Sequence, residues 1–144
     1  MGVPKGDRKE SSVEFENTYF KIYEDCVRLS THSFGANDKL KEEYKLYIAI
    51  MTKEVFTTIC EIGRFIRIAN SIYPIYQSEY EQRRIAQDKA IGLCYDLLTK
   101  YQLMMKTLKV KDNKYVEEIK HILHEINCLK KWRTSDNKRY KQLG

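Results

Sequence analysis

The chain has 144 residues and a formal net charge of +6, with 42% hydrophobic and 32% charged residues. This length suits one domain with a single core, and the hydrophobic content is too high for a disordered tail. Glycine and proline number only 6 and 2, which leaves little material for the tight turns of a β-sandwich or barrel. The basic balance favours an acidic partner, such as nucleic acid or an anionic protein surface.

No apolar stretch has membrane-spanning length, and the first residues lack the apolar segment of a signal peptide. We therefore expect a cytoplasmic protein without membrane contact, in which cysteines are reduced thiols. The cysteines recur every 34 residues, at Cys26, Cys60, Cys94 and Cys128. Their flanking sequences differ, so the spacing indicates four helices of similar length rather than a repeat. Because no CxxC pair exists, we favour small buried thiols over a metal site.

The first predicted helix follows a polar segment, residues 1–11, which we interpret as a flexible arm. Ser11 with Glu14 three residues later forms a capping-box pattern, which predicts a helix start. Apolar residues then recur at intervals of four and three, as expected for one face of a helix. They are Phe15, Tyr19, Ile22, Cys26 and Leu29.

A second helix is predicted over residues 40–70, after a turn at Gly35 and a cap at Asn37 or Asp38. Its apolar stripe consists of Tyr44, Ile48, Met51, Val55, Ile59, Ile62, Ile66 and Ala69. The stripe is widened by Tyr47, Ile50, Phe56, Phe65 and Ile68. A helix this broadly apolar packs on more than one side, either centrally in a bundle or at a subunit interface. Pro74 ends the segment, because proline does not fit a helix interior.

Two further helices follow. The third begins near Ser78, which forms a capping-box pattern with Glu81. Its stripe consists of Ala86, Ala90, Leu93, Leu97, Tyr101, Met104 and Leu108. The fourth begins after a cap at Asp112 or Asn113. Its stripe consists of Tyr115, Ile119, Ile122, Ile126 and Leu129.

Four helices joined by short links predict an all-α fold, an antiparallel four-helix bundle over residues 12–133. We interpret the basic residues after it, 134–144, as a flexible tail. Gly63 and Gly92 lie inside predicted helices, where glycine costs about 1 kcal/mol relative to alanine. We expect a close helix-to-helix approach at both glycines as compensation.

His121 and His124 lie one turn apart, with Glu125 and Cys128 nearby, and histidines at this spacing can share a metal ion. The order of zinc proteases, with histidines four residues apart around a glutamate, is absent. We favour two half-exposed histidines that flank the apolar stripe. No nucleophile motif or glycine-rich phosphate loop is present either. The sequence therefore predicts a protein that is not an enzyme and that has no cofactor or metal.

The basic residues are the informative class, because they cluster at helix ends and alternate with tyrosine and tryptophan. Such clusters fit a surface that follows a phosphate backbone, although many lysines only form a solvated face. The residues predicted to bind nucleic acid or a protein partner are Arg64, Arg67, Arg83, Arg84, Lys100, Lys106, Lys130, Lys131, Arg133, Lys138 and Arg139.

Trp132, the only tryptophan, lies between Lys131 and Arg133. It follows Leu129 by three residues, at the edge of the last apolar stripe, where it would cover the end of the bundle. The alternative is stacking on a nucleic-acid base, worth about 1–3 kcal/mol. We favour the structural role, because burial of such a ring is worth several kcal/mol.

The last predicted helix, DNKYVEEIKHILHEINCLKKW, resembles the closing helix of the accessory variability determinant (Avd) family. The shared features are a polar cap, an aromatic at Tyr115, an isoleucine–leucine stripe and a terminal tryptophan. The segment DKAIGLCYDLLTKYQLMMKTLKV resembles the preceding helix of that family, with a trailing basic residue at Lys106. The resemblance covers residues 15–134. Lys130 and Lys131 stand where small residues often precede the family tryptophan.

The resemblance implies a four-helix bundle that assembles into a ring-like homo-oligomer, typically a pentamer, with a basic surface. Avd proteins are not enzymes. They bind the reverse transcriptase of a diversity-generating retroelement and its template RNA or cDNA, and they support mutagenic copying into a variable gene. Two alternatives remain open. One is a small four-helix bundle protein of the type encoded within ribosomal RNA intervening sequences, and the other is a structural helical oligomer without a nucleic-acid role.

Overall fold

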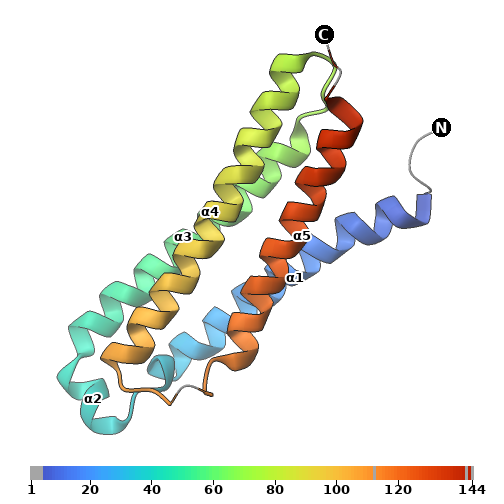
Figure 1. The fold of residues 1–144 in the computed structure, drawn as a ribbon. Coiled ribbons are helices and arrows are strands. Elements are labelled where there is room, and N and C mark those ends of the chain that lie inside the picture. Colours follow the sequence, from blue (N-terminus) through green and yellow to red (C-terminus); the bar gives the residue numbers. More distant parts are fainter. Residues whose placement is uncertain (1–4, 112, 142, 144) are drawn as a thin grey trace.

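A computed structural model describes the backbone of residues 5–111, 113–141 and 143, and side chains from Glu14 onward. Every element in this described part is a helix (Figure 1). They are α1 (Lys5–Thr31), the short 3-10 helix η1 (Ser33–Gly35), α2 (Asp38–Glu43), α3 (Lys45–Ser71), α4 (Gln77–Thr107) and α5 (Val116–Tyr140). The predicted all-α class is confirmed.

The helices pack together around a shared core. The closest pair is α3 and α4, which lie side by side along their length, while α5 packs against both α4 and α1 (Figure 1). A smaller contact joins α1 to α3, so the four long helices enclose the core from all sides. None of the helices in the part of the chain that the structure describes is both long and apolar enough to cross a membrane.

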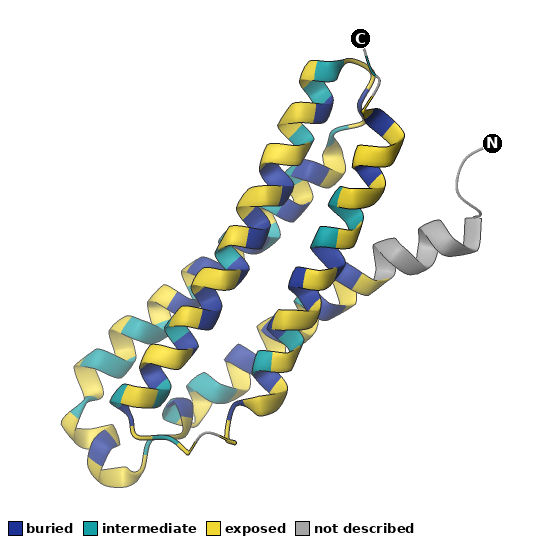
Figure 2. Ribbon diagram, viewed as in Figure 1, coloured by how far each residue is buried: buried dark blue, intermediate teal, exposed yellow. Residues whose placement is uncertain are grey.

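The buried residues follow the predicted stripes, and the buried bands of Figure 2 face the space between the long helices. Each long helix contributes side chains with at most 2% exposure, such as Ile22, Ile59, Leu97 and Ile126. Gly35 has a φ of +82°, so the predicted turn residue occupies the left-handed conformation that glycine favours. Tyr115 is fully buried, and its hydroxyl donates a hydrogen bond to the carbonyl of Phe34, which fixes this turn against the start of α5.

Two helix starts differ from the prediction. α1 begins at Lys5 rather than behind Ser11, because the segment KGDRKE consists largely of residues with good helix propensity. The proposed arm, residues 1–11, lies partly outside the described residues, and its flexibility stays a prediction. α4 begins at Gln77, where Glu79 accepts the backbone N–H groups of Ile75 and Tyr76, so the cap predicted at Ser78 is wrong.

The predicted second helix is interrupted at Tyr44, whose φ of −108° and ψ of 29° separate α2 from α3. Backbone hydrogen bonds continue across this kink, from Tyr44 N to Leu40 O and from Ile48 N to Tyr44 O. Asn37 caps α2 as predicted, because its side chain accepts the N–H of Leu40 at 2.8 Å. The predicted cap at Asn113 is wrong: Tyr115 directly precedes α5, and Asp112 is not among the described residues.

The boundary predicted at residue 133 is also wrong. α5 continues to Tyr140, so most of the basic tail predicted over residues 134–144 is helical. The reason is that the buried face of α5 continues beyond Leu129. Asp136 follows Leu129 by seven residues, Tyr140 follows Asp136 by four, and both side chains are buried. The basic residues of this segment are therefore held on a rigid helix.

The glycines and cysteines match the predictions in part. The Tyr19 ring occupies the space that a side chain at Gly63 would need, and its hydroxyl donates to the carbonyl of Ile59 at 2.9 Å. No atom lies near the corresponding space at Gly92, so the close approach predicted there is wrong. The cysteines do fall on four separate helices, but Cys60 is exposed while the other three are buried thiols.

Candidate nucleic-acid interface

The C-terminal half of α5 presents a continuous basic and polar surface. Its members follow each other at helical spacing and are all exposed, and we call them the α5 stripe: Asn127, Lys131, Thr134, Ser135 and Lys138. Together with His124 and Lys130 they line an open hollow of about 460 Å³. Ammonium, hydroxyl and amide groups in one row supply both the charge and the hydrogen-bond donors that phosphate oxygens accept.

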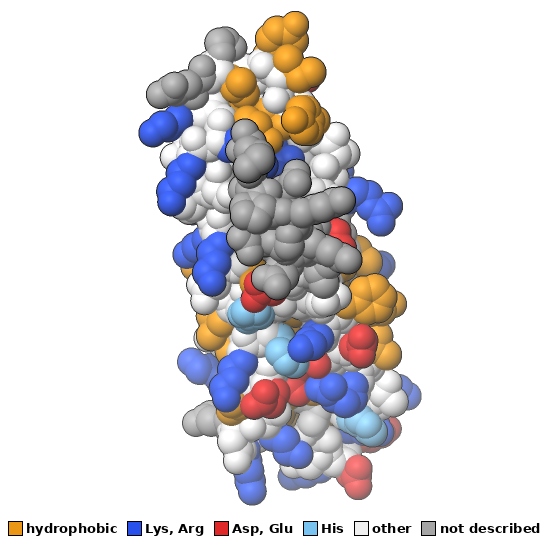
Figure 3. All heavy atoms as spheres, turned by 90° about the vertical axis from the view of Figure 1, so that its right-hand side faces the viewer, with side chains coloured by type: hydrophobic (Ala, Val, Ile, Leu, Met, Phe, Trp, Pro, Cys, Tyr) orange, Lys and Arg blue, Asp and Glu red, His pale blue; other side chains and the backbone are white. Residues whose placement is uncertain are grey.

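Acidic side chains are missing from the α5 stripe, because the one acid in this part of α5 points inward. Asp136 is 3% exposed and accepts two hydrogen bonds from Arg83, at 2.6 and 3.0 Å, and a third from Gln87 at 2.7 Å. In Figure 3, blue side chains follow the upper left edge of this face, while red ones gather lower down around the histidines. The surface of this half of α5 therefore has one sign of charge.

Four more of the predicted residues lie on the flanks of the α5 stripe. Lys130 is half-buried and donates to the Tyr95 hydroxyl at 2.9 Å, and Arg133 pairs with Asp88 at 2.7 Å. Arg139 is exposed and lies over the Tyr140 ring, and Arg84 approaches Asn137 from α4 at 3.5 Å. These contacts hold the four cations near the stripe but occupy part of their hydrogen-bonding capacity.

Arg83 and Lys100 serve the fold rather than a free surface. Besides Asp136, Arg83 binds the carbonyl of Ile72 at 2.9 Å, and its side chain is only 11% exposed. Lys100 donates to Thr58 at 2.6 Å and to Asp96 at 2.9 Å, and is 19% exposed. We therefore leave these two residues out of the proposed interface, since their donors already have partners inside the protein.

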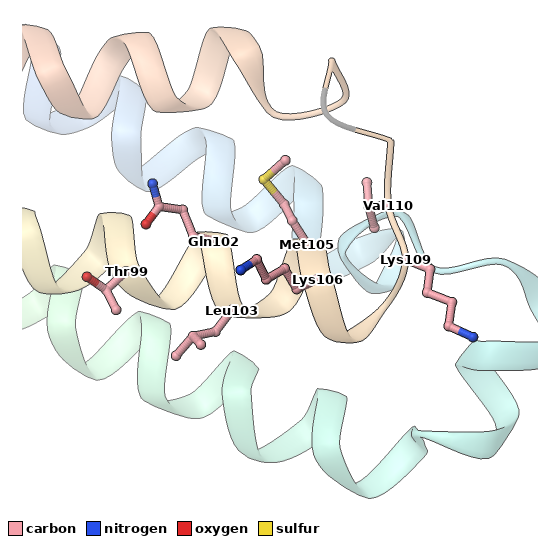
Figure 4. A pocket seen from close by; sticks show the side chains of 7 residues that line it. All are labelled: Thr99, Gln102, Leu103, Met105, Lys106, Lys109 and Val110. Atoms are coloured by element: carbon pink, nitrogen blue, oxygen red, sulfur yellow. The ribbon is translucent and has the colours of Figure 1, made fainter.

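The remaining predicted residues are distant from the α5 stripe. Arg64 and Arg67 are exposed on α3, beside a hollow at the seam with α1, and Arg64 pairs with Glu61 at 3.1 Å. Lys106 lies near the end of α4, on a larger hollow of about 670 Å³ at the opposite end of the molecule from Tyr140 (Figure 1). Figure 4 shows Lys106 beside Gln102, while Lys109 points away from both.

Trp132 packs against α1, at the edge of the core. Its ring stacks on Phe15 of α1, with centroids 4.6 Å apart and an interplanar angle of 15°. The Arg83 guanidinium lies over its ring at 5.1 Å, so the ring contacts an aromatic and a cation in the same protein. Trp132 is half-buried and joins the C-terminal half of α5 to α1, eight residues before α5 ends, rather than covering the end of the bundle.

We expect Trp132→Ala to lower the free energy of unfolding by about 2–4 kcal/mol, below the top of the range for truncating a buried tryptophan because the ring is only half-buried. Urea denaturation followed by circular dichroism measures this change. Tyr73→Ala is the matched control, because Tyr73 is 77% exposed and should change stability by less than about 0.5 kcal/mol. A Trp132→Ala protein with unchanged stability but without RNA binding would place the ring on the binding surface instead.

The two histidines of α5 have separate partners. His121 Nδ1 lies 2.6 Å from Asp25 of α1, and Arg28 bridges Asp25 and Glu118 in the same layer. His124 pairs with Glu14 of α1, at 3.1 Å from Nε2 to Oε1. Both histidines are partly exposed, as predicted. The part of the α1–α5 seam around the two histidines thus consists of charged and ionisable groups, which the spacing on α5 alone could not reveal.

Glu125, which directly follows His124, is a buried acid, and its burial was not predicted from the sequence. It is 0% exposed, and neither carboxyl oxygen has a hydrogen-bond partner among the described residues. Burial and, as a smaller cause, the nearby Glu14 carboxylate together raise the pKa of Glu125 to about 9. The carboxyl is therefore protonated at neutral pH, and the core carries no net charge at this position.

The arrangement as a whole is suited to binding an anion along a line. Lys131 and Lys138 supply the charge, and the hydroxyl and amide groups between them supply directed hydrogen bonds. Comparisons of the chain with protein families, with curated proteins and with solved structures gave no match.

Proposed function

We propose that this protein is a non-catalytic nucleic-acid-binding protein in which α1, α3, α4 and α5 form an antiparallel four-helix bundle. The observation that carries the proposal is the α5 stripe, in which Lys131 and Lys138 are exposed and the one acid in the C-terminal half of α5, Asp136, is buried. A rigid row of donors without acids attracts a phosphate backbone and shows little sequence preference. The two lysines are seven residues apart, or about 10.5 Å along the helix, close to the rise of three nucleotides in one strand.

The proposed biological role follows from the resemblance to Avd proteins. In this role the protein binds the reverse transcriptase of a diversity-generating retroelement together with its template RNA or cDNA, in the cytoplasm, and supports mutagenic copying. Co-purification of this protein with a reverse transcriptase and its template RNA tests the role, and the neighbouring gene identifies the candidate enzyme. Binding of RNA without any such enzyme would favour the alternative of a ribosomal intervening-sequence type of protein.

The lysines of the α5 stripe provide the sharpest test of the interface. We expect the double variant Lys131→Glu/Lys138→Glu to weaken binding of a labelled single-stranded RNA at least about tenfold, because two attractive contacts become repulsive. Fluorescence anisotropy at constant salt measures the affinity. Melting should change little, because both side chains are exposed.

Lys120→Glu is the matched control for this experiment. Lys120 lies on the same side of α5 but beside Glu117, at 3.5 Å, and is outside the stripe. Its reversal should leave RNA affinity close to that of the parent. The control reverses one charge and the double variant reverses two, so a control with about half of the double variant's loss in binding free energy would show that net charge, and not the α5 stripe, determines binding.

The proposed oligomer uses an exposed apolar edge at the seam of α1 and α3. Phe20 and Tyr23 of α1 are 63% and 41% exposed, and their rings lie 6.5 Å apart. Tyr23 meets Phe56 of α3 at 6.2 Å, and Val27 continues the edge with 42% exposure. Exposed aromatic side chains in one cluster are typical of protein–protein contacts. We propose that this edge joins copies of the chain in a ring-like homo-oligomer, a pentamer by resemblance.

We expect Phe20→Asp/Tyr23→Asp to convert the oligomer into monomers, because a carboxylate in a buried contact is not compensated. Light scattering coupled to size exclusion measures the mass. Ile85→Asp is the control, because Ile85 is 55% exposed on α4, away from this edge, and should keep the parental mass. A parental protein that is monomeric at micromolar concentration would contradict self-association.

A further inference from the structure

Three potential metal ligands meet at the seam between α1 and α5. His124 Nε2 lies 3.1 Å from Glu14 Oε1 and 3.6 Å from Cys128 Sγ, and the three ligand atoms all lie within 4.8 Å of one another. His124 and Cys128 are four residues apart on α5, so one helix turn fixes their relative position. Glu14 approaches from α1, a helix distant in sequence.

These separations match the edges of a tetrahedral zinc centre. With Zn–S near 2.3 Å and Zn–N or Zn–O near 2.0–2.1 Å, tetrahedral angles place sulfur and nitrogen ligands about 3.5 Å apart, and nitrogen and oxygen ligands about 3.3 Å apart. The observed distances of 3.6 and 3.1 Å therefore need shifts of a few tenths of an ångström. The third separation, between the Glu14 carboxylate and Cys128 Sγ, lies within 4.8 Å and closes to about 3.5 Å in such a centre. Thiolate, imidazole and carboxylate are also the three ligand types that zinc accepts.

We propose that Glu14, His124 and Cys128 bind one zinc ion, with water as the fourth ligand. The thiol is buried while the other two side chains are about half exposed, so the ion has a route from solvent and its water faces outward. Binding releases the thiol proton to solvent, and the ion gains two anionic ligands and one neutral ligand. The bound ion pins α1 to α5 at the beginning of the α5 stripe.

A neighbouring pair shows why the third ligand matters. His121 and Asp25 form an imidazole–carboxylate contact in the same seam, but Asp25 also pairs with Arg28 at 3.3 Å. The structure gives the Glu14 carboxylate no Arg or Lys partner in the described part of the chain, and adds a thiol at ligand distance from the imidazole. His121, Asp25 and Arg28 therefore form a complete ion-pair network. Glu14, His124 and Cys128 instead have the composition of a metal site.

The test is titration of the metal-free full-length chain with Co²⁺ and with Zn²⁺. We expect one equivalent of Co²⁺ to produce a thiolate charge-transfer band, Zn²⁺ to displace it, and Zn²⁺ to raise the melting temperature. Cys128→Ser should abolish the band and His124→Gln should weaken binding at least about tenfold, since even losing a supporting outer residue costs 10–100-fold.

Cys60→Ser is the matched control, because Cys60 is the exposed thiol and lies on α3. It should retain the band and the parental affinity. The proposal is overturned if no thiolate band forms, or if Cys128→Ser binds as the parent does while Cys60→Ser does not.

Discussion

Asp136→Ala should lower the free energy of unfolding by about 3–5 kcal/mol, one of the largest effects expected for a single substitution in this protein. Asp136 accepts three hydrogen bonds, two from Arg83 and one from Gln87, and all three side chains are largely buried. Without the carboxylate, the Arg83 guanidinium stays buried and uncompensated, and Gln87 loses its acceptor. Urea denaturation at neutral pH measures the loss.

Two variants separate this network from ordinary surface charge. Asp88→Ala removes the exposed ion pair with Arg133 and should cost less than about 1 kcal/mol. Arg83→Met/Asp136→Leu removes both buried charges and should recover much of the stability lost in Asp136→Ala. If Asp136→Ala were no more costly than Asp88→Ala, the buried network would not hold the C-terminal half of α5 in place.

Glu125→Met should raise the free energy of unfolding at pH 7 by about 1–3 kcal/mol, because methionine fills similar space without two unpartnered oxygens. In the parent protein, the contribution of Glu125 to the free energy of unfolding depends on pH. Burial raises the pKa of Glu125 to about 9, whereas the same group in the unfolded chain titrates near 4.5. Between these values the folded state keeps a proton that the unfolded state releases, so stability falls as pH rises.

The size of this pH effect follows from the two pKa values. From below pH 4.5 to pH 7, Glu125 alone should lower the unfolding free energy by about 3 kcal/mol, and the fall should continue to about pH 9. Glu125→Gln removes the titration, so the difference between parent and variant isolates it from other groups. Denaturation curves across this range, with a chelator present, test the prediction. A constant difference between the two proteins would contradict a protonated buried carboxyl.

The sequence predicted the helical class and most of the core, because apolar spacing reports directly on which face of a helix is buried. Ile22, Ile59, Leu97 and Ile126 were each placed on a predicted stripe, and each is buried. The break at Tyr44 could not be predicted, since the apolar spacing and the backbone hydrogen bonds continue through it. The spacing of apolar residues shows which way side chains point, but it does not change when a single residue such as Tyr44 adopts a non-helical ψ.

The candidate site was predicted less completely, because pairing over long distances in the sequence decides which cations are free. Arg83 and Arg84 are neighbours in a basic cluster, yet only Arg83 meets Asp136, a residue 53 positions later. The extension of α5 did have a signal in the sequence, namely Asp136 and Tyr140 at helical spacing after Leu129. Asp136 is charged, so a search for apolar residues at helical spacing does not include it. Only the structure shows that Arg83 pairs with it in the core.

The central proposal, a phosphate-binding surface on α5, is tested most directly by the salt dependence of RNA affinity. For single-stranded RNA, the logarithm of the binding constant should fall linearly with the logarithm of salt concentration, by about 0.7 for each phosphate neutralised. We expect the slope of the parent to exceed that of Lys131→Glu/Lys138→Glu by at least about 1, as two phosphate contacts are lost. An affinity that does not change with salt, or identical slopes for the two proteins, would contradict the proposed interface.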